Sequence, residues 1–224
     1  MKRWSVVAML AIMAAFLCTP AHALIEIKIS DGTTTIDLKD GDPGDTCAAV
    51  NCVTFNGVIG QWNINVDTGT SKDASDPNIM DLAFTAHHNA AAAGTGTTLT
   101  ITLSDNGFTG MNGFLEQLGG TQNAGGTVTA QLFGAINNTK FDTTNPLGPK
   151  FSTSVSPMAF TGSAPGTLVN PFSLTQVLTL SYGDVAGLTT GDWSVARTPE
   201  PASVAMFGGM LLATFGAIRR RVRR

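Results

Sequence analysis

Hydrophobic and polar residues alternate one by one along much of this chain. In the segment LIEIKIS, one side of an extended backbone carries Ile25, Ile27 and Ile29, and charged residues separate them. Successive side chains of a β-strand point to opposite faces of a sheet, so this pattern predicts strands with one buried and one solvated face. The same alternation occurs in QWNINV, MDLAFT, TLTITLS, TVTAQL, SLTQVLTLSY and GDWSVA.

Glycine, proline and aspartate clusters separate these runs. Asp31-Gly32 lies between LIEIKIS and TTTIDLK and predicts a β-hairpin with a tight turn. Pro157 weakens FSTSVSPMAF as a strand candidate. AHHNAAAAG and GFLEQLGG are candidates for short helical turns, and no stretch has a sustained helical period. We therefore predict an all-β fold, an antiparallel β-sandwich or jelly-roll-like domain of roughly nine to ten strands.

The N-terminus has the layout of a secretory signal peptide. Two basic residues precede an apolar run over residues 4–18, and Ala21-His22-Ala23 provides a small-x-small cleavage site. This predicts a signal helix over residues 1–23 and a mature chain that begins at Leu24. An uncleaved N-terminal anchor and a lipid attached at Cys18 are the alternatives.

The C-terminus has three parts in a fixed order. Pro199, Glu200 and Pro201 are followed by an apolar run over residues 202–218. The basic end consists of Arg219, Arg220, Arg221, Arg223 and Arg224. As a helix the apolar run would be about 26 Å long, at the short limit for a bilayer core of about 30 Å. The arginines would stay on the cytoplasmic side, so the segment predicts at least a transient transmembrane helix.

This tail resembles the PEP-CTERM sorting signal of exported bacterial proteins, a segment that is also described as an ice-binding protein C-terminal domain. The resemblance implies a sorting segment over residues 197–224, with the motif at 199–201. It implies an exosortase as partner, a membrane enzyme like the cysteine transpeptidases, in bacteria that make extracellular polysaccharide. The protein would then occupy the inner membrane during sorting and the cell envelope or extracellular matrix afterwards. Whether the tail is a removed label or a retained anchor stays open.

The domain between the two ends spans residues 24–196 and is acidic. From Leu24 to Thr198 the chain has six Lys and Arg against 15 Asp and Glu, a net charge of −9. Such a surface repels phosphates, so we do not expect a nucleic-acid partner. Cys47 and Cys52 form an even pair in an exported chain, which predicts a disulfide, with two free thiols as the alternative.

Candidate ligands for a metal are few. The loop DLKDGDPGD contains Asp37, Asp40, Asp42 and Asp45, which could bind calcium or simply form a solvated turn. The loop does not have the EF-hand spacing. His87 and His88 are adjacent and would face opposite sides of a strand, so we assign no metal ligands and no cofactor.

Catalytic motifs are absent from the sequence. It has no G-x-S-x-G elbow, P-loop or dinucleotide fingerprint, so we assign no catalytic residues. We expect Trp62 and Trp193 in the core rather than on a sugar-binding platform. The ridge formed by Thr98, Thr100 and Thr102 is expected to be a wet strand face, and a flat threonine array that binds ice is the alternative.

These observations favour a non-enzymatic protein of the cell envelope or extracellular matrix whose body is a structural or adhesive module. One alternative is a calcium-assisted carbohydrate-binding domain, and another is an envelope hydrolase, because a glycosidase needs only two carboxylates. Extracellular polysaccharide is the candidate partner of the body.

The sorting hypothesis predicts the effect of replacing Pro199, Glu200 and Pro201 together by alanine. Proline fixes φ and lacks an N–H, so it keeps the motif extended for a processing enzyme. The triple variant should accumulate unprocessed in the inner membrane with its body exported. Fractionation and intact-mass measurement test this. A variant that behaves like the wild type, and a mature mass that still includes Arg224, would instead indicate a permanent anchor.

Overall fold

The computed structural model describes residues 25–72, 79–90, 97–110, 113–123, 125–165, 168 and 170–198. The predicted signal peptide over 1–23, the motif Pro199-Glu200-Pro201, the apolar run over 202–218 and the basic end over 219–224 lie outside these residues. Within the described part of the chain, no helix has both the length and the apolar character needed to span a membrane.

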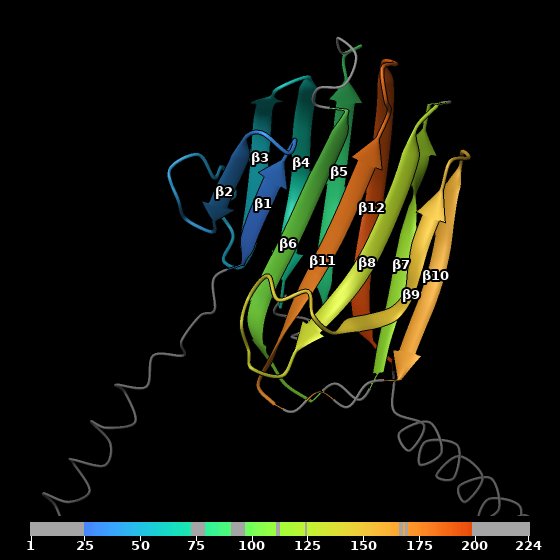
Figure 1. Ribbon diagram of the computed structural model, residues 1–224. Coiled ribbons are helices and arrows are strands. Elements are labelled where there is room, and N and C mark those ends of the chain that lie inside the picture. Colours follow the sequence, from blue (N-terminus) through green and yellow to red (C-terminus); the bar gives the residue numbers. More distant parts are fainter. Residues whose placement is uncertain are drawn as a thin grey trace, which may run out of the picture.

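The described chain folds into twelve antiparallel strands in two sheets (Figure 1). The strands are β1 (Glu26–Ser30), β2 (Thr35–Lys39), β3 (Cys52–Ile59), β4 (Trp62–Ser71), β5 (Met80–His88), β6 (Thr98–Phe108), β7 (Gly113–Gln122), β8 (Thr127–Ala135), β9 (Pro146–Thr153), β10 (Met158–Pro165), β11 (Phe172–Ser181) and β12 (Gly187–Arg197). The first sheet has the order β2-β1-β6-β11-β8-β9, and the second has the order β10-β7-β12-β5-β4-β3.

The all-β prediction is confirmed, and the predicted strand count of nine to ten is too low. GFLEQLGG, a candidate helical turn, is part of β7, because this segment pairs with β12 on one side and with β10 on the other. FSTSVSPMAF contributes to two strands rather than one. Pro157 lies in the turn between them, where its missing N–H removes no ladder hydrogen bond.

The predicted hairpin of β1 and β2 is present with a longer turn than expected. Ser30 pairs with Thr35, so four residues form the loop. The Asp31 carboxylate accepts the N–H groups of Thr33 and Thr34 at 2.9 and 2.7 Å, and Gly32 has φ +88°. The aspartate side chain therefore shapes the turn, and glycine supplies the left-handed residue.

The core lies between the sheets and consists of alternate residues from the strands of both. Trp62 and Trp193 are fully buried, as predicted from their alternating runs. Phe151 of β9 and Phe160 of β10 pack with ring centroids 5.0 Å apart and join the two sheets along one side. Because aromatic side chains bury large apolar areas, the burial of these tryptophan and phenylalanine rings contributes strongly to the hydrophobic stabilisation of the fold.

An acidic side chain of β7 points into this core. Glu116 on β7 is 1% exposed, and its Oε1 atom has no hydrogen-bond partner. Burial raises the pKa of Glu116 from 4.5 to about 7, because the interior disfavours the charged form. The folded protein therefore holds a proton on Glu116 that the unfolded chain releases at lower pH.

This shift predicts how the stability of a Glu116→Gln variant depends on pH. A raised carboxyl pKa removes stability as pH rises from about 4.5 to about 7, and the loss stays constant above that range. The neutral glutamine avoids the loss, so the variant should match the wild type at pH 4 and exceed it at pH 8 by up to about 3 kcal/mol. Denaturant unfolding across this range measures the difference, with Asp184→Asn as an exposed control. Equal curves for variant and wild type at pH 8 would contradict the prediction.

Candidate functional site

A groove of about 440 Å³ runs over the outer face of β7, β10 and β12 in the second sheet. Its lining residues are Gln117, Leu118, Gly119, Ala159, Phe160, Thr161, Asp192 and Ser194. The volume lies within the range of small-ligand sites. None of these lining residues is a lysine or arginine, so the groove is neutral to acidic.

The register of the strands creates the floor of this groove. Gly119 of β7 pairs with Asp192 on one side and with Ala159 on the other, and Asp192 also pairs with Ala83 of β5. Three of the four residues in this row have side chains no larger than a methyl group. A side chain added at Gly119 would meet no protein atom within 4 Å. The row is therefore low and open to solvent.

Polar rows lie on both sides of this low row. One row contains Thr70, Asp81, Ser194, Gln117 and Thr161, in strand order from β4 to β10. The other contains Asn56, Asn65, Thr85, Thr190 and Thr121, in strand order from β3 to β7. Every residue in these rows has a hydrogen-bonding side chain. Ser194, Gln117 and Thr161 of the first row line the groove itself, whereas the second row continues the polar surface beyond it.

Two carboxyl groups meet beside the groove. Asp81 on β5 is half-buried, and its side chain is hydrogen-bonded to that of the exposed Asp192 on β12. Burial first, and then the negative charge and the hydrogen bond of Asp192, raise the pKa of Asp81 to about 7. Two carboxylates can share a hydrogen bond only through a proton, so the pair holds one proton near neutral pH.

The acidic loop between β2 and β3 does not form a comparable site. Asp40 accepts the N–H of Asn51 at 2.7 Å, and Asp42 accepts that of Lys39 at 3.0 Å. Asp37 instead lies 3.5 Å from the ammonium group of Lys28. These carboxylates therefore serve separate partners, and no three His, Cys, Asp or Glu side chains in the described ranges could hold a metal together.

Asp45 and the disulfide connect this loop to β3. Asp45 accepts the N–H groups of Gly41, Cys47 and Thr54. Burial opposes ionisation of Asp45, but these hydrogen bonds outweigh it and lower the pKa of the carboxyl group. Cys47 and Cys52, the predicted pair, are joined by a disulfide with Cα atoms 5.9 Å apart. The loop is thus held by its own polar groups.

The two histidines face opposite sides of β5, as predicted. His87 is exposed, whereas His88 is buried with its Nδ1 atom 2.8 Å from the carbonyl oxygen of Val185. The buried ring lies 4.6 Å from the ring of Trp62, so both belong to the core at this end of the sandwich.

The threonine ridge is half-buried on the outer face of the first sheet. Thr98, Thr100 and Thr102 all point away from the core. The ridge belongs to a wider array, because one row in register contains Thr35, Ser30, Thr100, Thr179, Thr129 and Ser152. The sequence gives the residues of this row but not their alignment.

A second hollow of about 380 Å³ lies beside the loop between β8 and β9. Its polar groups serve the loop itself. Asp142 accepts the backbone N–H and the hydroxyl group of Thr144 at 2.9 and 2.6 Å and a hydrogen bond from Asn137 at 3.2 Å. These hydrogen bonds hold the loop, and the groove on the second sheet is the stronger candidate site.

The described residues thus form an all-β protein of two antiparallel six-stranded sheets with a polar groove on one outer face. No family model and no curated protein matches the chain. Among solved structures, it is similar to TmCBM61 in complex with β-1,4-galactotriose, with 7% identity, a TM-score of 0.35, and coverage of 63% of this chain and 92% of that one.

Two further solved structures are similar at the same level. The N-terminal cellulose-binding domain of β-1,4-glucanase C from Cellulomonas fimi has 13% identity and a TM-score of 0.34, with coverage of 65% of this chain and 93% of that one. The adhesin domain of Epf from Streptococcus pyogenes has 11% identity and a TM-score of 0.42, with coverage of 79% and 60%. The likeness is one of general β-sheet architecture.

The carboxyl pair generates a prediction for an Asp192→Asn variant. Removing the negative charge next to Asp81 should lower the pKa of the Asp81 carboxyl group below about 7, although burial still holds it above the ordinary value. Carbon-detected NMR titration of the Asp81 carboxyl group measures this change. Asp67→Asn, an exposed change on the same sheet, should leave the titration midpoint where it is. An unchanged midpoint in Asp192→Asn would show that the two groups do not interact.

Proposed function

We propose that this chain is an exported, non-catalytic glycan-binding protein whose β-sandwich holds a polysaccharide chain in the groove over β7, β10 and β12. The observation that carries the proposal is the open, low row at Gly119 between two polar rows. A groove that crosses several strands suits an extended polymer better than a compact molecule. The rigid ladder on both sides of β7 holds the polar walls in place before the ligand binds.

The polar groups of the groove match the chemistry of sugars. Each sugar hydroxyl both donates and accepts hydrogen bonds. Gln117, Ser194 and Thr161 can do the same, and Asp192 adds a strong acceptor. Ala159 contributes an apolar side chain to the lining, whereas the ring of Phe160 packs against Phe151 of the first sheet. The absence of a cation from the lining and the net charge of −9 favour a neutral glycan over an anionic one.

Binding without catalysis fits the carboxyl pair better than hydrolysis does. A retaining glycosidase holds its two carboxyl groups about 5 Å apart, and an inverting enzyme holds them farther apart. Asp81 and Asp192 are hydrogen-bonded to each other and share a proton, so they do not act as the two separate carboxyl groups that either mechanism needs. We therefore favour the carbohydrate-binding alternative without a calcium requirement.

The two ends of the chain supply the proposed route to the ligand. A signal peptide over 1–23 would direct export, and the PEP-CTERM-like segment over 197–224 would deliver the protein to an exosortase in the inner membrane. Sorting would place the body in the cell envelope or in the extracellular polysaccharide matrix. Glycan binding would then give the body its structural or adhesive role there.

A Gly119→Val variant tests this proposal. The new side chain enters open space and suits a strand, so the variant should stay folded while it fills the groove. Affinity electrophoresis with soluble neutral galactan, xylan and β-glucan should show retardation of the wild type by at least one of them, with alginate as the anionic comparison. The variant should bind at least about tenfold more weakly, since about 1.4 kcal/mol corresponds to that factor.

Thr129→Val on the outer face of the first sheet is the matched control. It introduces the same residue, valine, at a half-buried strand position away from the groove without a change in side-chain volume, and should leave binding unchanged. Absence of retardation by every neutral polysaccharide, or equal retardation of Gly119→Val and the wild type, would overturn the proposal.

A further inference from the structure

A buried ion pair links the two sheets at the end of β4. The Nζ atom of Lys72, the residue after β4, lies 2.8 Å from the Oδ2 atom of Asp105 on β6. The Asp105 side chain is fully buried, and that of Lys72 is 17% exposed. β4 belongs to the second sheet and β6 to the first, so the pair crosses between the two layers.

Each atom of this pair has a further partner. The backbone N–H of Asn106 donates to Oδ1 of Asp105 at 2.7 Å, and the hydroxyl group of Ser71 donates to Oδ2. Nζ of Lys72 lies 2.5 Å from the carbonyl oxygen of Asn106. The ring of Phe108 lies 5.1 Å from the same nitrogen and excludes water on that side. The pair is thus fixed in a nearly dry site.

We propose that Lys72 and Asp105 condense to an intramolecular amide bond that joins the two sheets covalently. The lone pair of the Nζ atom attacks Cγ of Asp105, the bond from Cγ to Oδ2 breaks, and Oδ2 leaves as water. The ammonium group of Lys72 first transfers one proton to the carboxylate of Asp105, which leaves a neutral amine and a protonated acid. The two hydrogens of the water are this transferred proton and one more from the attacking amine. The products are one amide and one water molecule, so no oxidant, reductant or co-reactant is needed.

The surroundings supply the groups that this reaction requires. A nitrogen in hydrogen-bond contact with the carboxyl group is at the distance of a near-attack geometry. The N–H of Asn106 is directed at Oδ1, where negative charge develops when Nζ adds to Cγ. The hydroxyl group of Ser71 donates a hydrogen bond to the leaving oxygen, and the carbonyl of Asn106 accepts one from Nζ and orients the nitrogen; the proton that Nζ loses on addition passes to the leaving oxygen.

Burial also favours the reactive form of the acid. Desolvation raises the pKa of Asp105, although the charge of Lys72 and the hydrogen bonds of Ser71 and Asn106 act in the opposite direction. A protonated carboxyl group is a better electrophile than a carboxylate. Release of water from a site that excludes it favours the amide over the ion pair.

The pair of Lys140 and Glu26 is the natural comparison. Their Nζ and Oε2 atoms lie 2.5 Å apart, and the side chains are 22% and 8% exposed. In the described residues no backbone N–H or hydroxyl group donates to the Glu26 carboxylate, unlike that of Asp105. We expect this pair to remain an ion pair. It therefore serves as an internal control that shows whether a short distance between an ammonium and a carboxylate group is enough for the reaction when no further donor contacts the carboxylate.

Trypsin digestion of the full chain, denatured and reduced, tests the proposal by mass spectrometry. Trypsin cleaves after Lys39, Lys72 and Lys140, and releases peptides 40–72 and 73–140 from an unmodified chain. An acylated Lys72 resists trypsin. The wild type should therefore yield one species that contains residues 40–140 and is lighter than the uncleaved sequence by one water molecule. Fragmentation should locate the link at Lys72 and Asp105.

Two variants separate the reaction from other losses of water. Lys72→Arg keeps the positive charge but should release both peptides at unmodified mass, as should Asp105→Ala, and neither readout depends on folding. Lys140→Arg should retain the linked species. Separate peptides 40–72 and 73–140 at unmodified mass from the wild type would overturn the proposal and leave a buried ion pair. Loss of water that persists in Lys72→Arg would overturn it as well.

Discussion

The two-residue period of the β-strand is the constraint on which this structure depends. Two sheets share one apolar layer, so the strands direct alternate side chains into it. Trp62 and Trp193 lie in that layer, and their neighbours in sequence point to solvent. The outer faces are therefore free to carry polar rows without loss of core packing. Both the groove and the threonine array exist because of this division.

The same layer limits how charge can be buried. An isolated ion in a protein interior is strongly disfavoured, so a buried acid must be neutralised or paired. Glu116 follows the first route, because burial shifts its pKa toward protonation. Asp105 follows the second, through Lys72 at the edge of the core (Figure 1 shows β4 and β6 in different layers). The two groups thus mark where the sandwich departs from a purely apolar interior.

The alternation of hydrophobic and polar residues allowed most of the strands to be predicted from the sequence. Where that alternation is interrupted, as in β7, the strand was not predicted. The run MDLAFT predicted β5 and the burial of Leu82 and Phe84 correctly. In β7 the glycines at 119 and 120 interrupt the pattern, and pairing on both sides decides the structure instead. The local sequence indicates the secondary structure that a segment prefers, but pairing with neighbouring strands in the folded protein can override that preference.

The candidate site was beyond sequence analysis for a related reason. Asp81 and Asp192 lie in different strands, and only the register of β5 against β12 brings them together. Nothing in either segment specifies that register, since it follows from the packing of both inner faces. The acidic loop, by contrast, attracted attention because its carboxylates are close in sequence. In the structure those carboxylates organise their own turns.

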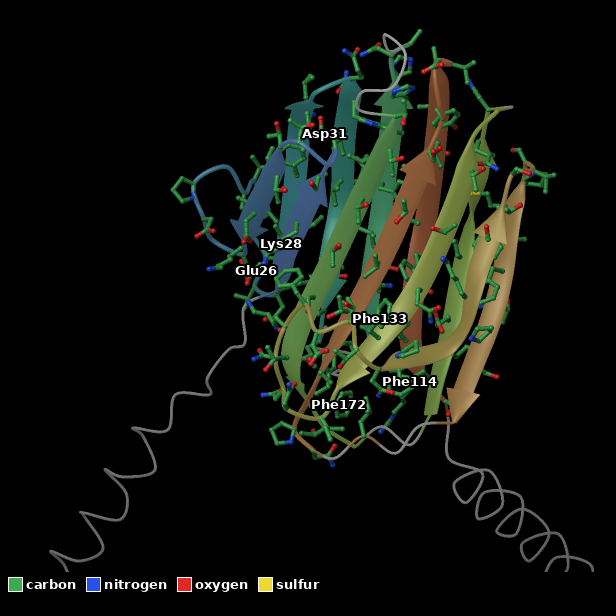
Figure 2. The ribbon with its side chains drawn as sticks, in the orientation of Figure 1. Glu26, Lys28, Asp31, Phe114, Phe133 and Phe172 are labelled. Atoms are coloured by element: carbon green, nitrogen blue, oxygen red, sulfur yellow. A yellow bond between two sulfur atoms is a disulfide. The ribbon has the colours of Figure 1, made fainter. Side chains whose placement is uncertain are left out.

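The end of the sandwich also bears on the proposed sorting. β12 continues to Arg197, and the N–H of Thr198 still donates to the carbonyl of Gly113 at 3.0 Å. Pro199 is the next residue in the sequence. Figure 2 shows β12 among the strands of its sheet. Its last residue, Arg197, is paired with Phe114 of β7 and so belongs to the sheet rather than to a linker. A processing enzyme that reads the motif would therefore work directly against the folded body, and the position of the body relative to the membrane would decide whether it can reach the backbone.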